Sequence, residues 1–309
     1  MLTRRHLLAA GAALPFGACA AAPAFRIGYQ RNGLLLAAKA RGSIEAALGR
    51  GASVGWVEYP SGPPLLEAMS VGGLEFGGTG DTPPIFAQAA GARIVYVAAQ
   101  PVTGRAAAIV VPAASRLRSA ADLKGAKLAY TRGSSAQNFI RAALRPDGLD
   151  LRDVETINLA PDQALAAFAA GAVDAWAIWD PFLAKAEVDH AARVLVAGNG
   201  LARSNSFLLA NADAVVTKPE LVRATLDALV VTAAWATQHR DQLVALIAAA
   251  GLAPKVAERI AARQDFGVIP LTGARIAEQQ RLADALHASG QLPGAVVVER
   301  AIWHGWHPV

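Results

Sequence analysis

Two segments of this chain, 99 positions apart, carry the same pattern of residues. Each has an Ala/Leu-rich run, a glycine, a short apolar run, and an aspartate with proline close behind it. The glycine and the aspartate are Gly72 and Asp81 in the first copy, and Gly171 and Asp180 in the second. This pattern predicts a helix that stops at the glycine, a buried strand, and a next helix capped by the aspartate. Open α/β sheets bind ligands where strands end and helices begin, so two such corners predict two lobes with a ligand between them.

Strand-like and helix-like segments alternate along most of the chain. This alternation predicts an α/β fold with mostly parallel sheets flanked by helices. One helix is expected over 34–48, another opens at Gly133-Ser134-Ser135 and runs to Leu144, and the chain from about 219 to 287 is nearly all helical. The expected strands are 25–30, 53–58, 93–99, 107–111, 127–130, 154–159, 193–196 and 206–210.

The alternation is interrupted twice, near 101–105 and near 198–205, where proline and glycine residues gather. Two interruptions of this kind predict that the chain crosses between lobes twice. We therefore expect one lobe built from both ends of the chain, 25–104 and 206–309, and a second, inserted lobe over 105–205. The two crossings would form the hinge.

Residues 1–24 are typical of an export signal. Arg4 and Arg5 precede a run of mostly apolar and small residues over 7–22, which resembles a twin-arginine signal. Cleavage near the end of this segment would remove Cys19, the only cysteine. Alternatively, Cys19 carries a lipid and anchors the protein as a lipoprotein. Either outcome predicts a protein exported to the periplasm.

Charge and hydropathy exclude other classes of partner. Without Arg4 and Arg5 the chain has 27 basic against 24 acidic residues, a net charge of +3. The lysines and arginines are scattered, so we expect no nucleic acid partner. No apolar run after the export signal is as long as a membrane span.

Motifs for catalysis or metal binding are missing from the sequence. It contains no G-x-S-x-G, no P-loop and no G-x-G-x-x-G after a strand. His304 and His307 have no third ligand nearby. We therefore expect neither an enzyme nor a bound metal or cofactor.

The candidate binding residues are small polar side chains at helix starts, together with one tryptophan. Unpaired N–H groups and the helix dipole can hold an oxyanion there without a formal positive charge, although each residue alone is also explained as a helix cap. Trp179 ends a strand and is placed to contact the apolar part of a ligand, whereas Trp176 is expected in the core. The full set is Gln30, Ser61, Gly62, Thr79, Gly80, Asp81, Ser134, Ser135, Asn138, Trp179 and Asp180.

Five segments together resemble the aliphatic sulfonate-binding proteins of ABC importers. The segments are 26–30, 58–63, 79–92, 133–138 and 174–182, and the likeness spans about 25–203. The resemblance implies a type II periplasmic binding protein that closes on an alkanesulfonate and presents it to a permease in the inner membrane. We expect it to act as a monomer.

The family's pocket maps by motif onto eight residues of this chain. Ala136 and Gln137 stand where the family commonly has serine and histidine, so the resemblance does not fix the ligand. The eight matching residues are Gln30, Thr79, Gly80, Asp81, Ser134, Ser135, Trp179 and Asp180.

Three alternatives stay open at this stage. Binding proteins for taurine, nitrate and sulfate esters share the same outline. Thiamine-pyrimidine synthases share the fold but are cytoplasmic enzymes. A binding protein of this fold can also serve a sensor rather than an importer.

Overall fold

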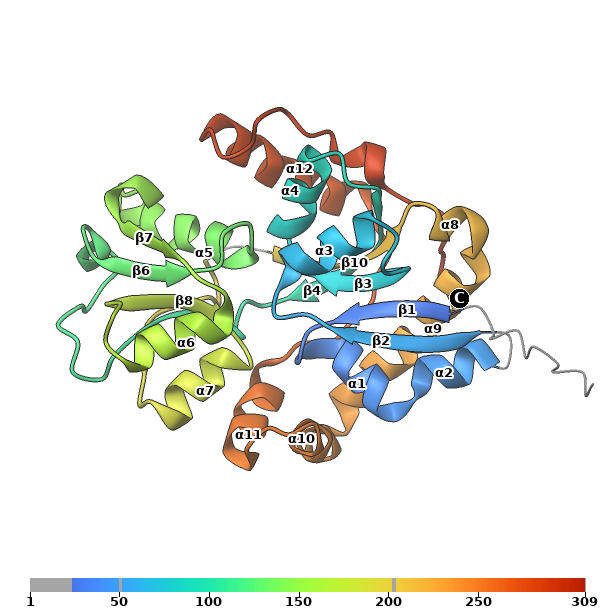
Figure 1. Ribbon diagram of the computed structural model, residues 1–309, viewed down its shortest axis with the longest axis horizontal. Coiled ribbons are helices and arrows are strands. Elements are labelled where there is room, and N and C mark those ends of the chain that lie inside the picture. The colour runs from blue at the N-terminus through green and yellow to red at the C-terminus, as the bar shows by residue number, and fades with distance from the viewer. Residues whose placement is uncertain (1–23, 50–51, 202–203, 309) are drawn as a thin grey trace, which may run out of the picture.

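The computed structural model describes residues 24–49, 52–201 and 204–308. The predicted export signal with its Cys19 lies outside these residues. Figure 1 shows two α/β halves side by side, each around its own sheet, with the first and last parts of the chain in the same half. No helix in the described ranges is long and apolar enough to cross a membrane.

The first half is built on a five-stranded sheet with the order β2-β1-β3-β10-β4. Strand β1 pairs in parallel with β2 and β3, and β10 lies antiparallel between β3 and β4. The strands are β1 Ala24–Tyr29, β2 Ser53–Glu58, β3 Phe76–Thr79, β4 Ile94–Val102 and β10 Ser204–Asn211.

The second half repeats this arrangement with the order β7-β6-β8-β5-β9. Strand β6 is parallel to β7 and β8, and β5 is antiparallel to β8 and β9. Both sheets are therefore mixed, with more antiparallel pairing than the sequence suggests, because β5 and β10 enter by the crossings between halves. The strands are β5 Ala107–Val111, β6 Lys127–Tyr130, β7 Glu155–Asn158, β8 Ala175–Trp179 and β9 Arg193–Ala197.

Helices cover both faces of each sheet (Figure 1). The first half has α1 Gly33–Arg41, α2 Ser43–Leu48, α3 Gly62–Ser70 and α4 Thr82–Ala89, and the second has α5 Ser135–Leu144, α6 Pro161–Ala169 and α7 Phe182–Asp189. After β10 come α8 Ala214–Thr217, α9 Pro219–Gln238, α10 Arg240–Ala249, α11 Pro254–Arg263 and α12 Gly273–Ala288. Short 3₁₀ turns lie at Ala121–Leu123, Arg145–Asp147, Leu151–Asp153 and Val298–Ala301.

The single helix expected over 34–48 is wrong. The chain forms α1 and α2 instead, because Gly42 takes a left-handed conformation with φ of 62° that ends α1. The expected helix from Ser135 to Leu144 is confirmed.

Each sheet has an apolar core on both faces. In the first half, α1, α9, α10 and α11 pack on one face, and α3, α4 and α12 on the other. In the second half, α5 covers one face, and α6 and α7 the other. Trp176 lies in this last core with only 1% of its surface exposed, which confirms its predicted structural role.

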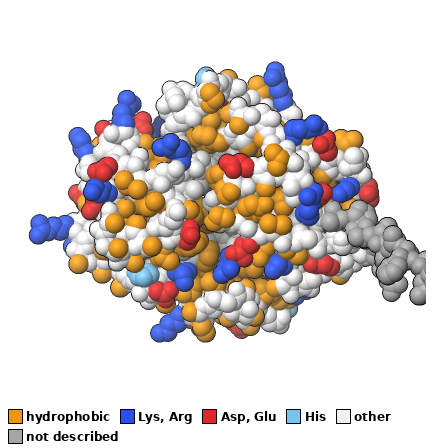
Figure 2. Space-filling view, viewed as in Figure 1, with side chains coloured by type: hydrophobic (Ala, Val, Ile, Leu, Met, Phe, Trp, Pro, Cys, Tyr) orange, Lys and Arg blue, Asp and Glu red, His pale blue; other side chains and the backbone are white. Residues whose placement is uncertain are grey.

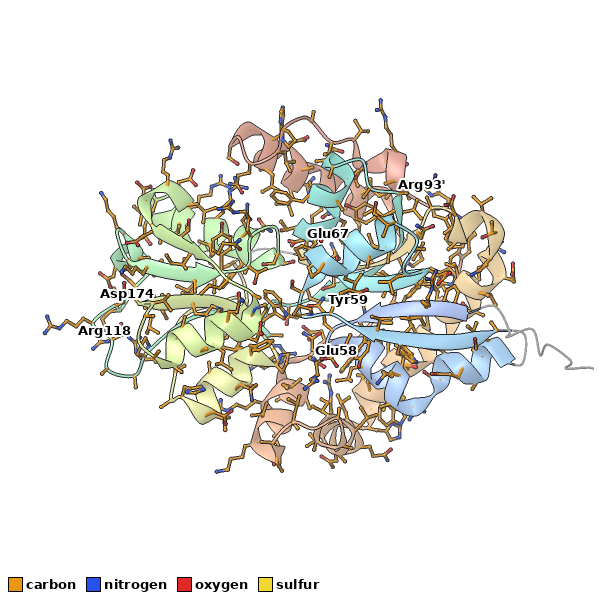
Figure 3. All side chains as sticks on the ribbon, in the orientation of Figure 1. Glu58, Tyr59, Glu67, Arg93, Arg118 and Asp174 are labelled. Carbon is orange, nitrogen blue, oxygen red and sulfur yellow. The ribbon has the colours of Figure 1, made fainter. Side chains whose placement is uncertain are left out.

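Glu75 and Asp174, which stand 99 positions apart at equivalent places in the two copies of the repeat, make the same backbone contacts in the two halves. The Glu75 carboxylate accepts from the Arg26 N–H at 2.8 Å, and the Glu75 N–H donates to the Arg26 carbonyl at 2.9 Å. Asp174 exchanges the same two hydrogen bonds with Lys127, at 2.8 and 2.9 Å. Asp174 lies at the end of its sheet remote from the first half (Figure 3). The repeat in the sequence is therefore also a repeat in the structure.

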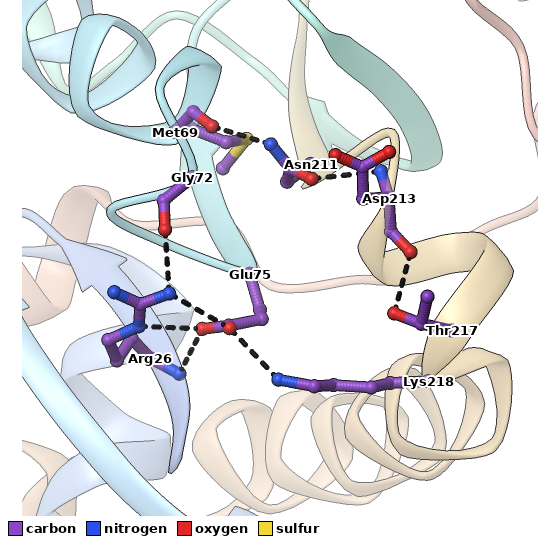
Figure 4. A network of polar contacts seen from close by, with 8 residues as sticks. All are labelled: Arg26, Met69, Gly72, Glu75, Asn211, Asp213, Thr217 and Lys218. Carbon is purple, nitrogen blue, oxygen red and sulfur yellow. Dashed lines mark hydrogen bonds and ion pairs between the residues drawn. The ribbon is translucent and has the colours of Figure 1, made fainter. Parts of the chain in front are cut away.

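Within the described residues, Glu75 has additional cationic partners and Asp174 has none. The Arg26 guanidinium and the Lys218 ammonium both lie 3.0 Å from its carboxylate (Figure 4). Burial alone would raise the pKa of Glu75, but the hydrogen bonds from these cations outweigh it and lower the pKa. This network ties β1 and β3 to the start of α9.

The two crossings between the halves touch at Gly104 and Gly198. A Cβ atom on either glycine would lie 2.5 Å from the carbonyl oxygen of the other. Gly104 also has a φ of 80°, which favours glycine. The close approach brings both connections together at one point between the sheets.

Candidate functional site

A cavity of about 250 Å³ lies between the two halves, where the parallel strands of both sheets end. Residues from both halves line it, as the two repeated corners predict. Nine of the predicted binding residues are among them, although their role in binding stays a prediction. They are Gln30, Gly62, Thr79, Gly80, Asp81, Ser134, Ser135, Asn138 and Trp179.

Ser61 and Asp180 are buried but are not among the residues that line the cavity. Ser61 precedes α3 without a capping hydrogen bond from its side chain. The Asp180 carboxylate turns away from the cavity and accepts from the Ala184 N–H at 3.0 Å, near the start of α7. Asp180 precedes Pro181, the N-cap residue of α7, and of the two repeated aspartates it is the one whose side chain binds an N–H group in the first turn of the next helix.

The start of α5 lies at the cavity and is fixed by local hydrogen bonds. Ser134 is the N-cap: its hydroxyl accepts from the Ala136 N–H at 3.3 Å and donates to the Thr131 carbonyl at 2.6 Å. The Gln137 side chain accepts from the Gly133 N–H at 2.8 Å. The N–H groups of Ala136 and Gln137 both donate to Ser134, at 3.3 and 3.0 Å, and the dipole of the helix favours an anion at this end.

Asp81 was expected to cap α4, and it does stand at the N-cap position, but its side chain makes no capping hydrogen bond. The carboxylate instead accepts from the Thr82 hydroxyl at 3.0 Å and from the Asn138 amide at 2.8 Å, and it also contacts the Ser135 hydroxyl. Burial raises the pKa of Asp81, and these three hydrogen bonds partly oppose the rise. Because Ser135 and Asn138 belong to α5, the carboxylate bridges the two halves beside the cavity.

Apolar residues from both halves also line the cavity. Trp179, half-buried at the end of β8, is one of them. The other apolar lining residues include Leu34, Leu35, Val102, Phe139 and Ile178. The cavity therefore combines polar helix starts with a surface suited to a hydrocarbon chain.

Several lining residues are absent from the sequence-based set. They are Asn32, Gln100, Asn205, Ser206, Arg263, Gln264 and Asp265. Asn205 and Ser206 were missed because β10 runs antiparallel, which puts its amino end at the cavity. Recognising that a crossing strand reverses direction would have found them. Arg263 follows no strand, and the sequence carries no local signal for its position.

The charges around the cavity are few and paired. Arg263 is the single cation among the described lining residues, and it pairs with Glu187 and Asp180 of the second half. Asp265 accepts from the Thr103 N–H at 2.9 Å and from Arg105 at 2.7 Å. Burial raises the pKa of Asp265, but these partners outweigh it and lower the pKa.

No group of three His, Cys, Asp or Glu side chains gathers as a metal site would require within the described ranges. Lys and Arg side chains are dispersed over the face shown in Figure 2.

Comparison with known proteins identifies relatives over most of the chain. A family model described as "NMT1/THI5 like" matches residues 50–243. A putative aliphatic sulfonates-binding protein of Escherichia coli is 38% identical over 283 residues, which cover 91% of this chain and 88% of the relative. One of Bacillus subtilis is 35% identical, covering 70% of this chain and 66% of the relative.

Solved structures agree with these relatives. The alkanesulfonate-binding protein SsuA from Xanthomonas axonopodis pv. citri, bound to MOPS, has a TM-score of 0.88 and 40% identity, covering 92% of this chain and 99% of that chain. The periplasmic aliphatic sulphonate binding protein SsuA from Escherichia coli has a TM-score of 0.80 and 38% identity, covering 93% and 92%. These likenesses confirm the resemblance and the two-lobed α/β fold that the motifs predicted.

Proposed function

Because the chain belongs to the NMT1/THI5-like family and to its aliphatic sulfonate-binding members, we propose that it captures an aliphatic sulfonate in the cavity between its halves. It is a binding protein rather than an enzyme, like these relatives. It delivers the sulfonate to the permease of an ABC importer.

The observation that carries this proposal is the convergence of two helix starts, one from each half, on a single cavity. Ser134 and Ser135 open α5, and Thr79 and Gly80 precede α4; all four line the cavity. A sulfonate keeps its negative charge at every physiological pH and offers three oxygen acceptors. Backbone N–H groups and hydroxyls at helix starts supply donors for such a group without a formal charge.

The apolar lining of the cavity contributes to recognition as well. An alkanesulfonate has a hydrocarbon chain beside its charged head, and Trp179 with Phe139 offers surface for that chain. Each square ångström of apolar surface removed from water contributes about 25 cal/mol. Inorganic sulfate and nitrate cannot make this contact.

The export signal indicates the compartment in which the protein acts. The export signal over residues 1–24 directs the chain to the periplasm, where it acts as a monomer between uptake and delivery. Two lobes close on the ligand by bending at the two crossings. One lobe consists of 25–104 and 206–309, and the other of 105–205. The choice between plain cleavage and a lipid on Cys19 is decided by mass spectrometry of protein from its native compartment.

Titration calorimetry tests the proposed ligand. Ethanesulfonate, butanesulfonate and hexanesulfonate would be titrated beside taurine, sulfate and nitrate. We expect the Kd of the alkanesulfonates to be at least tenfold lower than the Kd of sulfate and of nitrate. This ratio corresponds to about 1.4 kcal/mol of binding free energy. Tighter binding of nitrate or taurine than of every alkanesulfonate would overturn the proposal.

A further inference from the structure

Arg263 connects the two halves at the edge of the cavity. It is the last residue of α11, which packs on the first half, yet its guanidinium reaches the second half. Its Nη2 donates to the carboxylate of Glu187 in α7, and its Nη1 lies 3.5 Å from Asp180 Oδ1. These three residues form what we call the Arg263 cluster.

The Arg263 cluster is shielded from water. The exposed fractions of its side chains are 17% for Arg263, 12% for Glu187 and 0% for Asp180. Ala184, which lies on α7 between the two acids, is fully buried in an apolar core of the first half. The charges therefore interact in a setting where they are weakly screened, and separating them leaves a buried charge without a partner.

The pairing within the cluster is incomplete. Arg263 Nη1 and Asp180 Oδ2 are both buried, and neither has a hydrogen-bond partner in the described residues. The 3.5 Å between Nη1 and Oδ1 is within ion-pair range but longer than the usual N–H···O distance of about 2.9 Å. A small further approach of the halves would let these atoms form the hydrogen bonds that they lack.

The segment that carries Arg263 also reaches the crossing between the halves. Asp265, two residues later, pairs with Thr103 and Arg105 in the connection from β4 to β5. Arg263 and Trp179 line the same cavity. One short segment thus contacts the crossing, the cavity and the opposite half.

We propose that Arg263 is a positioning residue that holds the cleft closed, with or without a ligand, by pairing with Glu187 and Asp180. It acts by holding the second half in place and does not bind the sulfonate itself. The identity of the ligand in this inference rests on the proposed function, but the closure does not. When the halves separate, water solvates all three side chains, so the paired arrangement exists only in the closed form.

The test compares Arg263→Gln, Glu187→Gln, the double variant and Arg263→Lys. Stopped-flow release of hexanesulfonate should be about tenfold faster or more in each glutamine variant, because a buried charge loses its partner. The double variant should release the ligand no faster than the faster single variant, since both remove one interaction. Arg263→Lys, which keeps the charge, should recover part of the loss.

Arg259→Gln is the matched control. Arg259 also approaches Glu187, at 3.5 Å, but it is 51% exposed and does not line the cavity. Exposed pairs contribute little, so its release rate should stay within about twofold of wild type.

Three outcomes would overturn the inference. Faster release in Arg263→Gln alone, with Glu187→Gln at the wild-type rate, would mean that the pairing with Glu187 does not hold the cleft closed. Fully additive effects would mean that the two residues are not coupled. Unchanged radii of gyration in both glutamine variants, measured without ligand, would mean that the cluster does not hold the halves together. This scattering experiment remains decisive even if no sulfonate binds, an outcome that would reject only the proposed function.

Discussion

Gly80 and Ser135 both line the cavity and lie so close to each other that no side chain fits between them. A Cβ atom on Gly80 would lie 1.9 Å from the Ser135 hydroxyl oxygen and 2.9 Å from its Cβ. The two residues belong to opposite halves of the protein. The backbone of Gly80 needs no positive φ, so the contact with Ser135, and not local conformation, requires glycine here.

Gly80→Ala should therefore keep the halves from closing while leaving each half folded. We expect calorimetry to show at least tenfold weaker binding of butanesulfonate, in line with the 1–3 kcal/mol that overpacking typically costs. Adding Ser135→Gly removes the obstruction, so the double variant should bind better than the sum of the single losses predicts. Gly273→Ala is the control, because its Cβ meets nothing within 4 Å. Normal affinity of Gly80→Ala would show that the closed contact is not needed for binding.

The helix start of α5 gives a second prediction. Ser134→Ala combined with Ser135→Ala should weaken sulfonate binding by between tens and thousands of fold, because it removes the Ser134 cap of α5 and the Ser135 contact with Asp81, and each lost hydrogen-bonding group costs about 1–3 kcal/mol. Arg132 is exposed beside the same loop, and Arg132→Ala should change the Kd little. Near-native affinity of the double serine variant with a collapse for Arg132→Ala would mean that a side-chain cation holds the anion.

Trp179→Ala should affect long alkanesulfonates more than short ones. Its contribution scales with the apolar area that it covers, and a longer chain covers more of the ring. The ratio of variant to wild-type Kd should rise from ethanesulfonate to hexanesulfonate in calorimetric titrations. An equal loss for every chain length would place the tryptophan against the head group or away from the ligand.

Asp180 predicts a pH dependence of stability. Burial raises its pKa to about 6, although Arg263 opposes the rise, so the acid stays protonated to a higher pH in the folded protein than in the unfolded chain. The stabilisation from this group is fully present below the unfolded pKa of 3.8 and is lost as the pH rises through about 6.

Asp180→Asn, which can still accept from the Ala184 N–H, should remove that loss. The free energy of unfolding of the variant relative to wild type should therefore increase between pH 4.5 and 7 and then level off. Urea unfolding at half-unit steps measures it. A difference that stays flat or falls over this range would contradict the prediction.

The sequence predicted where the helices before the repeated strands end, but it missed a break between two other helices. Gly72 and Gly171 both take positive φ and end the helices before the repeated strands, as their position in the repeat indicates. The break at Gly42 was missed, since a glycine within an Ala/Leu-rich run is also tolerated inside a helix. The lobe boundaries at 104–105 and 205–206 stay a prediction.

Of the cavity, the sequence predicted the residues that follow parallel strands. Asp81 was placed at the cavity, but the direction of its carboxylate depends on Asn138 and Ser135 from the other half. The position of Arg263 could not be predicted from the sequence, because only the packing of α11 on α7 brings this residue to the cavity. Contacts between distant segments leave no periodic signal in either one.

The identical strand order of the two sheets gives the molecule an approximate twofold symmetry about the cavity. A cavity between two equivalent corners would present similar groups from both sides and could not by itself orient an unsymmetrical molecule. The helices α9 to α12 break this equivalence, because they follow only the final return of the chain to the first sheet. They bring Arg263, paired with Glu187 and Asp180, to one edge of the cavity, where the repeat supplies no counterpart. The two edges of the cavity therefore differ, and an unsymmetrical molecule meets unlike surroundings at its two ends.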